Sequence, residues 1–240
     1  AGFFAVAIIL ALGVMGNMVQ ANAISNAFAT AFHVPAVAVG VILAIISAFI
    51  FMGGVTRIAS VTEKLVPVMA VCYLVGSLII VFANITSLPG VFHDIFVGAF
   101  DPEAIVGGGV GIGMMQAVRY GVARGLFSNE AGLGSTPHAH AMAKVDKPQD
   151  QGHIAIVCVF IDTFVVLTLT AMVILTTGVN TAYTGDDSVA DSLAQMAFGT
   201  LFGTNLGNMF VAICLFFFAF STIIGWYFFG EQNVKYLFGV

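Results

Sequence analysis

Residues 104–141 read AIVGGGVGIGMMQAVRYGVARGLFSNEAGLGSTPHAHA, and this stretch decides how the rest of the chain is interpreted. It begins as an apolar segment that holds five glycines between Gly107 and Gly113. It then acquires Gln116, Arg119 and Arg124, and it ends in a loop that contains glycine, proline and histidine. A helix that only crosses a membrane needs none of these features, so the pattern favours a helix that handles a substrate.

The composition places the whole chain in a membrane. Of its 240 residues 60% are hydrophobic and 8% are charged, whereas soluble domains carry about 25% charged residues. We therefore predict an all-α polytopic membrane protein, with residues 1–240 forming one transmembrane domain. Both ends lie against apolar runs, so we expect a fragment of a longer protein. No basic run is present, which argues against a nucleic-acid partner.

Long apolar segments predict six membrane helices. Each approaches or exceeds the roughly 20 residues that cross a bilayer. Their predicted bounds are Phe3 to Ala27, Ala36 to Gly53, Leu65 to Ala83, Ala104 to Leu126, Ile154 to Thr177, and Leu206 to Phe229.

The basic residues support this count because all seven fall at alternate connections. They are Arg57, Lys64, Arg119, Arg124, Lys144, Lys147 and Lys235. The intervening loops, near residues 30–35, 84–103 and 178–205, contain no lysine or arginine and are acidic in the two longer cases. By the positive-inside rule the basic connections are cytoplasmic, and the chain is a multi-pass protein of the cell's inner or plasma membrane.

The last outward loop is predicted to contain a short amphipathic helix from Ser188 to Phe198. Its apolar face would hold Val189, Leu193, Met196 and Ala197. Two interpretations remain open: a surface helix packed on its own loop, or a lid over a binding site.

Polar side chains inside apolar helices are the first candidates for chemistry, because they are costly in a membrane. Asp162 lies about nine residues into the fifth predicted helix, roughly 12 Å deep at 1.5 Å per residue. It is either a cation- or proton-linked site or a structural acid. Ser221 and Thr222 either bond back to their own helix or supply hard oxygen ligands to an alkali cation.

Two further side chains could contact a substrate. Trp226, the only tryptophan, shares a helix face with Thr222 and either walls a small pocket or anchors at the membrane interface. Gln20 shares a face with Asn17 and either contacts a substrate or bonds to another helix.

Enzymatic and metal functions find little support. The glycine-rich run lacks the preceding strand of a dinucleotide fingerprint and reads either as a weakened helix that exposes backbone groups or as tight helix packing. No cysteine or acid cluster accompanies the histidines, so we expect no metal cofactor. No catalytic pair falls at membrane depth, and we predict a non-enzyme.

Residues 121–135, GVARGLFSNEAGLGS, resemble the signature of the alanine/glycine:cation symporter family, the sodium-coupled amino-acid carriers of bacteria and archaea. Other segments agree along nearly the whole chain: GNMVQAN at 16–22, EKLVP at 63–67, FIDT at 160–163 and FSTIIGW at 220–226.

The resemblance implies a partial leucine-transporter-type fold of two inverted repeats. Residues 1–85 would close the first repeat and residues 104–230 would open the second. Gln20, Met114, Met115, Gln116, Thr222 and Trp226 would line the pocket for a small amino acid. Ser221, Thr222 and Asp162 would bind sodium, and the cytoplasmic motif with Arg124, Asn129 and Glu130 would shape the inner gate. The predicted function is sodium-coupled symport of alanine or glycine, with a proton-coupled carrier and an amino-acid-gated receptor or channel as alternatives.

Overall fold

A computed structural model describes residues 1–100, 118–123, 125, 128, 130, 133–182 and 187–239. These residues form helices and connecting turns, and they contain no strand. The prediction of an all-α protein is therefore confirmed. The chain divides into two compact units, one made of residues 1–80 and 177–240 and the other of residues 81–176.

The first unit begins with one continuous rod of three helical segments. α1 (Gly2–Ile8) runs into the π-helix η1 (Ile9–Gly16) and then into α2 (Asn17–Phe32). A π-helical stretch shifts the backbone hydrogen bonds by one residue and is often found at functional sites. α2 ends at His33, whose φ of 56° is left-handed, two residues before Pro35, which cannot continue a helix.

α3 (Ala36–Phe51) and α4 (Gly54–Ala83) follow. α3 matches the second predicted helix closely. The third helix was predicted to begin at Leu65, but α4 begins eleven residues earlier. The charged residues taken for a loop lie inside it, and Arg57 is held in place because its Nη1 donates to the Phe49 carbonyl at 2.8 Å. Long charged side chains at a helix end can reach water while the helix continues.

α11 (Asp187–Phe202) and α12 (Thr204–Phe238) form a helical hairpin in the same unit. Gly203 makes the turn with φ 83°, a value that a side chain would disfavour. A Cβ atom on Gly207 would lie 2.5 Å from the Gly199 nitrogen and 2.6 Å from the Phe198 carbonyl carbon. The two helices therefore meet backbone to backbone.

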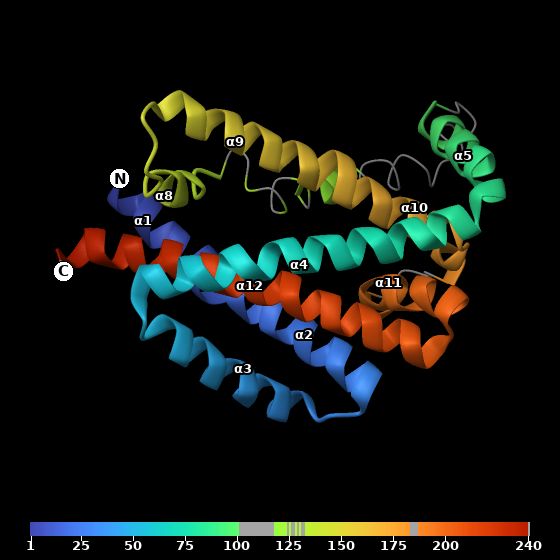
Figure 1. Ribbon diagram of the computed structural model, residues 1–240, viewed down its shortest axis with the longest axis horizontal. Helices are drawn as coiled ribbons and strands as arrows, with labels where there is room; N and C mark the ends of the chain where they lie inside the picture. Colours follow the sequence, from blue (N-terminus) through green and yellow to red (C-terminus); the bar gives the residue numbers. More distant parts are fainter. Residues whose placement is uncertain are drawn as a thin grey trace. The chain divides into compact units, whose positions relative to one another are not determined.

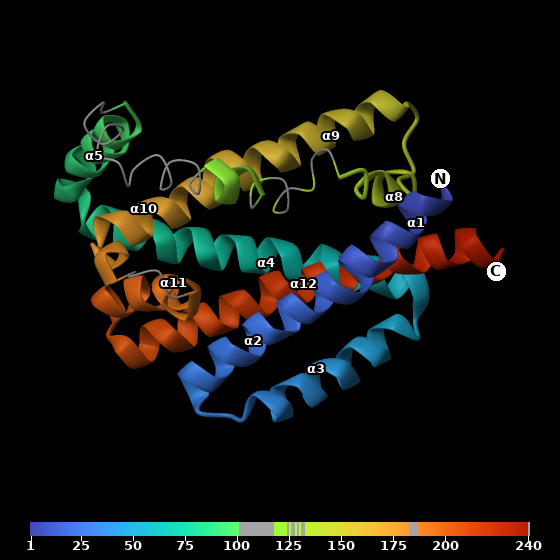
Figure 2. The ribbon, with the colours of Figure 1, turned by 180° about the vertical axis from the view of Figure 1, so that it is seen from behind.

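Figures 1 and 2 show α2 crossing α12, with α3 beside α2 and α11 folded back along the start of α12. The core of this unit lies where α2, α3, α4 and α12 meet. Its buried members are Ile24, Val39, Leu43, Ile50, Ile58, Ala219, Phe220, Ile223 and Ile224. An aromatic group joins α4 to the hairpin, with Phe198 stacked on Phe210 and Tyr73 meeting Phe218 edge to face.

The second unit contains the end of α4, the short 3-10 turn η2 (Ile85–Ser87), α5 (Leu88–Phe100) and α8 (Pro137–His140). α9 (Pro148–Phe160), the π-helix η3 (Ile161–Leu167) and α10 (Thr168–Thr176) form its long rod. The sequence predicted a loop where α5 lies. Pro89 falls in the first turn, where proline is tolerated, and apolar residues follow it.

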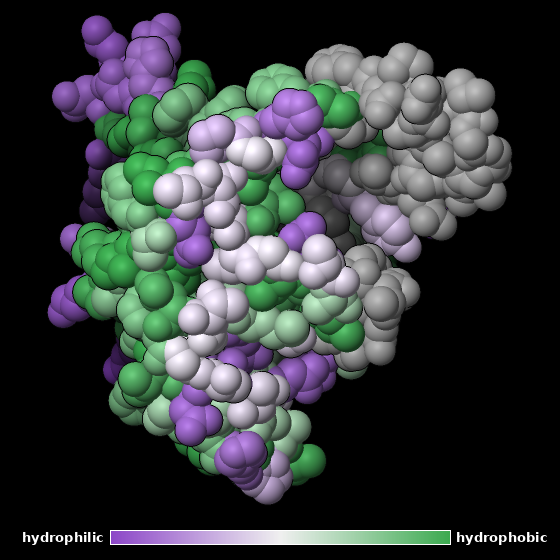
Figure 3. Space-filling model, turned by 90° about the vertical axis from the view of Figure 1, so that its right-hand side faces the viewer, coloured by the Kyte–Doolittle hydropathy of each residue, from purple (hydrophilic) through white to green (hydrophobic). Residues whose placement is uncertain are grey.

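Within the described residues, four helices are long and apolar enough to cross a membrane: Gly2–Phe32, Gly54–Ala83, Pro148–Thr176 and Thr204–Phe238. They correspond to the first, third, fifth and sixth predicted helices. α3 is shorter, at 16 residues, and most of the predicted helix from Ala104 to Leu126 lies outside the described residues. Many large apolar side chains are exposed, and Figure 3 shows hydrophobic residues reaching the surface among hydrophilic ones. These features indicate a polytopic membrane protein.

Candidate functional site

The first candidate site lies where the η1–α2 rod crosses α12. Gly13 and Gly230 meet with little between them, since a Cβ on Gly13 would lie 3.5 Å from the Gly230 Cα. One turn along, a Cβ on Gly16 would lie 2.5 Å from Cζ3 and 2.7 Å from Cε3 of Trp226. The indole therefore rests directly on a glycine. Trp226 is 3% exposed, which excludes the surface position expected of an interfacial anchor.

Asn17 follows this contact and carries an unsatisfied buried oxygen. Its Nδ2 donates to the Gly13 carbonyl at 3.2 Å. Its Oδ1 is buried and has no hydrogen-bond partner among the described residues. Leaving a buried acceptor unpaired costs about 1–3 kcal/mol, and such an atom in a native structure calls for an explanation such as an ion, water or ligand. The end of the π-helix therefore presents a buried acceptor oxygen that can bind a hydrogen-bond donor or a cation.

Gln20 continues the same face of the rod. Gly13, Gly16 and Gln20 are spaced by three and four residues, so they lie on one stripe. On the antiparallel helix α12, Gly13 lies opposite Gly230 and Gly16 lies opposite Trp226. Thr222 lies one further turn along α12. The register thus sets Gln20 at the level of Thr222. Gln20 is half-buried.

The hydroxyls of Ser221 and Thr222 both bond back to their own helix. Each donates to the Phe218 carbonyl, at 2.8 Å and 3.0 Å respectively. Ser221 Oγ also lies 3.8 Å from Met69 Sδ of α4. Each hydroxyl donates its single proton to this carbonyl, so its oxygen lone pairs stay available as acceptors. Such hydrogen bonds are common within helices, and here they also fix the orientation of the Ser221 and Thr222 hydroxyl oxygens.

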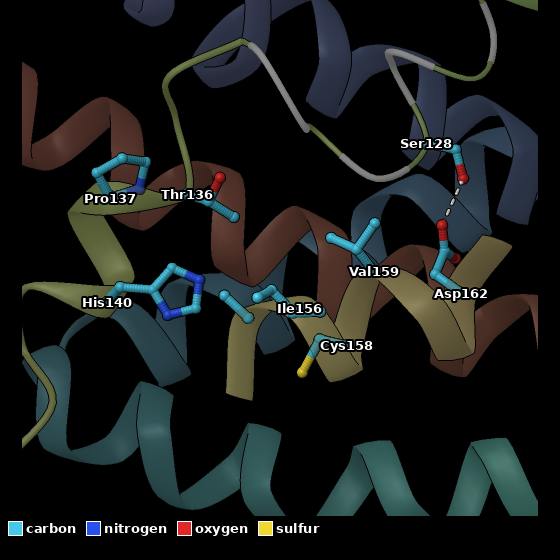
Figure 4. Close-up of a pocket in the computed structure, with 9 residues that line it drawn as sticks. Ser128, Thr136, Pro137, His140, Ile156, Cys158, Val159 and Asp162 are labelled. Carbon is cyan, nitrogen blue, oxygen red and sulfur yellow. Dashed lines mark hydrogen bonds between the residues drawn. The ribbon is translucent and has the colours of Figure 1, made fainter. Parts of the chain in front are cut away.

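A second candidate site lies in the other unit, around Asp162 in the π-helix η3. Ser128 Oγ donates to Asp162 Oδ2 at 3.2 Å. The two residues lie at one end of a pocket of about 540 Å³, and Thr136, Pro137 and His140 lie at the other end (Figure 4). Apolar side chains of α9 separate the two ends. The carboxylate is half-buried, so it can accept a further donor or a cation.

The loop before α8 is closed by its own polar groups. Ser135, which is fully buried, donates its hydroxyl to Glu130 Oε2, and His138 Nδ1 donates to the Ser135 carbonyl at 2.8 Å. Glu130 takes a left-handed φ of 55°. His140 Nδ1 pairs with Gln151 Nε2 at 2.7 Å. No group of three or more histidine, cysteine or acidic residues in the described parts of the chain could hold a metal ion.

Comparison with known proteins shows the family of the chain. The sodium:alanine symporter family matches residues 1–240. The chain belongs to this family. Its relatives include the sodium/proton-dependent alanine carrier protein of Bacillus sp. (strain PS3), 40% identical over 242 residues, which cover 96% of this chain and 53% of the carrier.

Two further relatives have similar identity to the chain. The sodium/alanine symporter AgcS of Methanococcus maripaludis is 40% identical over 226 residues, covering 94% of this chain and 48% of AgcS. The amino-acid carrier protein AlsT of Bacillus subtilis is 40% identical over 234 residues, covering 98% of this chain and 48% of AlsT. The chain thus spans about half the length of the curated relatives it matches. The family resemblance seen in the sequence is confirmed, and the family consists of transporters.

In the structure, the predicted site residues fall into three groups. Gln20, Ser221, Thr222 and Trp226 lie in the first unit, on α2 and α12, which cross where Gly16 meets Trp226. Asp162 and Glu130 lie in the second unit, so the predicted sodium ligands fall into two units that are each described by themselves. Met114, Met115, Gln116, Arg124 and Asn129 lie outside the described residues.

Two residues of the first site were not predicted to belong to it. In the sequence, Gly16 stood out only as part of the segment 16–22, and Asn17 only as sharing a helix face with Gln20. The contact of Gly16 with Trp226 depends on the crossing of α2 and α12, which no local pattern reveals. The available signal was their three- and four-residue spacing from Gln20.

Proposed function

We propose that this chain is part of a sodium-coupled symporter that carries a small neutral amino acid, alanine or glycine, across the plasma membrane. It would work by alternating access within a leucine-transporter-type pair of inverted repeats. The observation that carries the proposal is the α2–α12 crossing, where an indole rests on a glycine beside a buried amide oxygen of Asn17, within two helices of membrane length.

The crossing suits a small substrate. Trp226 supplies a flat apolar wall, and Gly16 lies directly against one part of it. Gln20 can both donate and accept, which matches the carboxylate and ammonium groups of an amino acid. The Asn17 Oδ1 is an acceptor only and so favours the ammonium group. Apolar walls with a few convergent polar groups are the usual composition of a small-molecule site.

Hard oxygens suit the coupling ion. Alkali and alkaline-earth cations prefer hydroxyl, carbonyl and carboxylate oxygens. Ser221 and Thr222 direct their protons to Phe218 and so keep acceptor lone pairs for a cation. Asp162 offers a carboxylate within the second unit. Each set supports sodium binding, and the names of the relatives AgcS and the Bacillus carrier point to sodium as well.

Coupling follows if sodium and the amino acid favour the same occluded state, because their affinities are then reciprocally linked. Uptake of labelled alanine by cells that express the full-length protein tests this. We expect uptake that requires sodium, is abolished by choline replacement, and is competed by glycine. Uptake that is indifferent to sodium and follows the pH gradient would establish the proton-coupled alternative. Binding without accumulation would indicate a receptor or channel.

A further inference from the structure

α11 is held against the candidate binding face by a buried amide. Gln195 is 6% exposed, which is uncommon for a glutamine. Its Nε2 donates to the carbonyl of Ala27 on α2 at 3.4 Å, although the two residues are 168 positions apart in the chain. Ala27 is itself buried. A polar side chain therefore takes part in the contact between α11 and α2, where an apolar one would pack without the cost of desolvation.

The position of this bond on α2 relates it to the candidate site. Ala27 lies on the stripe that contains Gln20 and Ile24, because the three residues are spaced by four and three. It is two turns beyond Gln20, roughly 10 Å along the helix at 1.5 Å per residue. α11 thus contacts α2 at the end of the binding face that the charge distribution assigns to the outside.

The other contacts of α11 leave little room for movement. Gly207 touches the backbone of Phe198 and Gly199, so α11 and the start of α12 behave as one rigid hairpin. Phe198 is fully buried and stacks on Phe210 of α12, with ring centroids 5.1 Å apart. The hydrogen bond from Gln195 to the Ala27 carbonyl, by contrast, is long at 3.4 Å. Closely packed backbones do not separate easily, whereas a bond of this length can be exchanged for water at small cost.

We propose that Gln195 is the clasp that closes the outer side of the binding face, and that its bond to the Ala27 carbonyl forms and breaks once in each transport cycle. The inference rests on the proposed function, since it needs alternating access. The outer gate opens where α11 separates from α2, while the packing of α11 on α12 stays intact. Gln195 acts through α11 and is therefore a positioning residue.

Hydrogen exchange of the α11 backbone in the full-length protein tests the clasp. Gln195→Met keeps the length and the apolar packing of the side chain but removes the donor. Ser192→Ala is the matched control, because Ser192 is one turn earlier on α11 and its hydroxyl bonds only within that helix, to Val189 and Met196. With saturating sodium and alanine, we expect peptides from residues 192–202 to exchange about 3- to 10-fold faster in Gln195→Met than in the unmodified protein, the effect of losing one hydrogen bond. Ser192→Ala should match the unmodified protein.

Equal hydrogen-exchange rates of these peptides in Gln195→Met and Ser192→Ala would refute the proposal that Gln195 closes the outer side. Gln195→Asn is the second variant, because its amide is one methylene shorter and cannot reach as far; it should also exchange faster. If both Gln195 variants fail to fold while Ser192→Ala folds, Gln195 is a structural residue and the clasp is wrong. Uptake by the unmodified protein is measured in parallel. Intact sodium-dependent uptake with unchanged exchange would refute the clasp alone, and absent uptake would refute the proposed function.

Discussion

Adding one methyl group at Gly16 should displace Trp226. The new Cβ would lie 2.5 Å and 2.7 Å from two indole carbons, whereas carbon atoms rest comfortably at about 3.5–4.0 Å. The indole must therefore retreat by roughly 1 Å from a position in which it is 3% exposed. Overpacking of this kind costs about 1–3 kcal/mol, and alanine returns about 0.5–1 kcal/mol of helix preference.

The net expectation for Gly16→Ala is a loss of roughly 1–2 kcal/mol, or about 5- to 30-fold in the ratio of folded to unfolded protein. Because the indole is the proposed wall of the pocket, the KM for alanine should rise as well. The assays are thermal unfolding of the purified full-length protein and the concentration dependence of alanine uptake.

Two matched glycines serve as controls for this prediction. A Cβ on Gly40 of α3 would meet nothing within 4 Å, and one on Gly13 would meet Gly230 at an ordinary 3.5 Å. Gly40→Ala should leave uptake unchanged and stabilise slightly, and Gly13→Ala should be tolerated. The reasoning fails if Gly16→Ala melts and transports like Gly40→Ala.

Three other variants test separate parts of the structure. Replacing Ser221 and Thr222 together by alanine should raise the sodium concentration for half-maximal uptake about 10- to 100-fold, since two oxygen ligands are lost; an unchanged sodium titration would exclude them as ligands. Asp162→Asn keeps an acceptor for the Ser128 hydroxyl but removes the charge. We therefore expect normal expression and a sodium concentration for half-maximal uptake that is about tenfold higher or more. An unaltered sodium titration would show that the acid is structural. Gly207→Ala forces a Cβ to within 2.6 Å of two backbone atoms, so thermal unfolding should show a loss of at least about 2 kcal/mol; Gly199→Ala, whose nearest atom is 3.5 Å away, should show much less.

Helix content was predictable because it depends on local composition. The apolar segments from Ala36, Ile154 and Leu206 begin within a few residues of α3, α9 and α12. α5 was missed because the Pro89–Gly90 pair and the polar His93–Asp94 pair suggest a loop, although a proline in the first turn is compatible with a helix. The two π-helices have no local signature that distinguishes them from α-helix.

The outer helix shows the same limit. Its existence was predicted near Ser188 to Phe198, but Met196, assigned to its apolar face, is 39% exposed, whereas Gln195 is buried. Hydrophobicity alone cannot assign a glutamine to the interior, because the hydrogen bond that compensates its burial comes from α2. The candidate site was predictable to the extent that its residues share a helix face. The contact of Gly16 with Trp226 joins segments 210 residues apart, and it follows only from the packing of α2 on α12.

The central claim is that sodium entry drives accumulation of a small neutral amino acid. The most direct measurement is the uptake of labelled alanine into liposomes that contain the purified full-length protein, with an inward sodium gradient and buffered, equal pH on both sides. The account predicts transient accumulation above the external concentration, which collapses when a sodium ionophore removes the gradient. Equilibration without accumulation, or accumulation that persists without sodium, would contradict it.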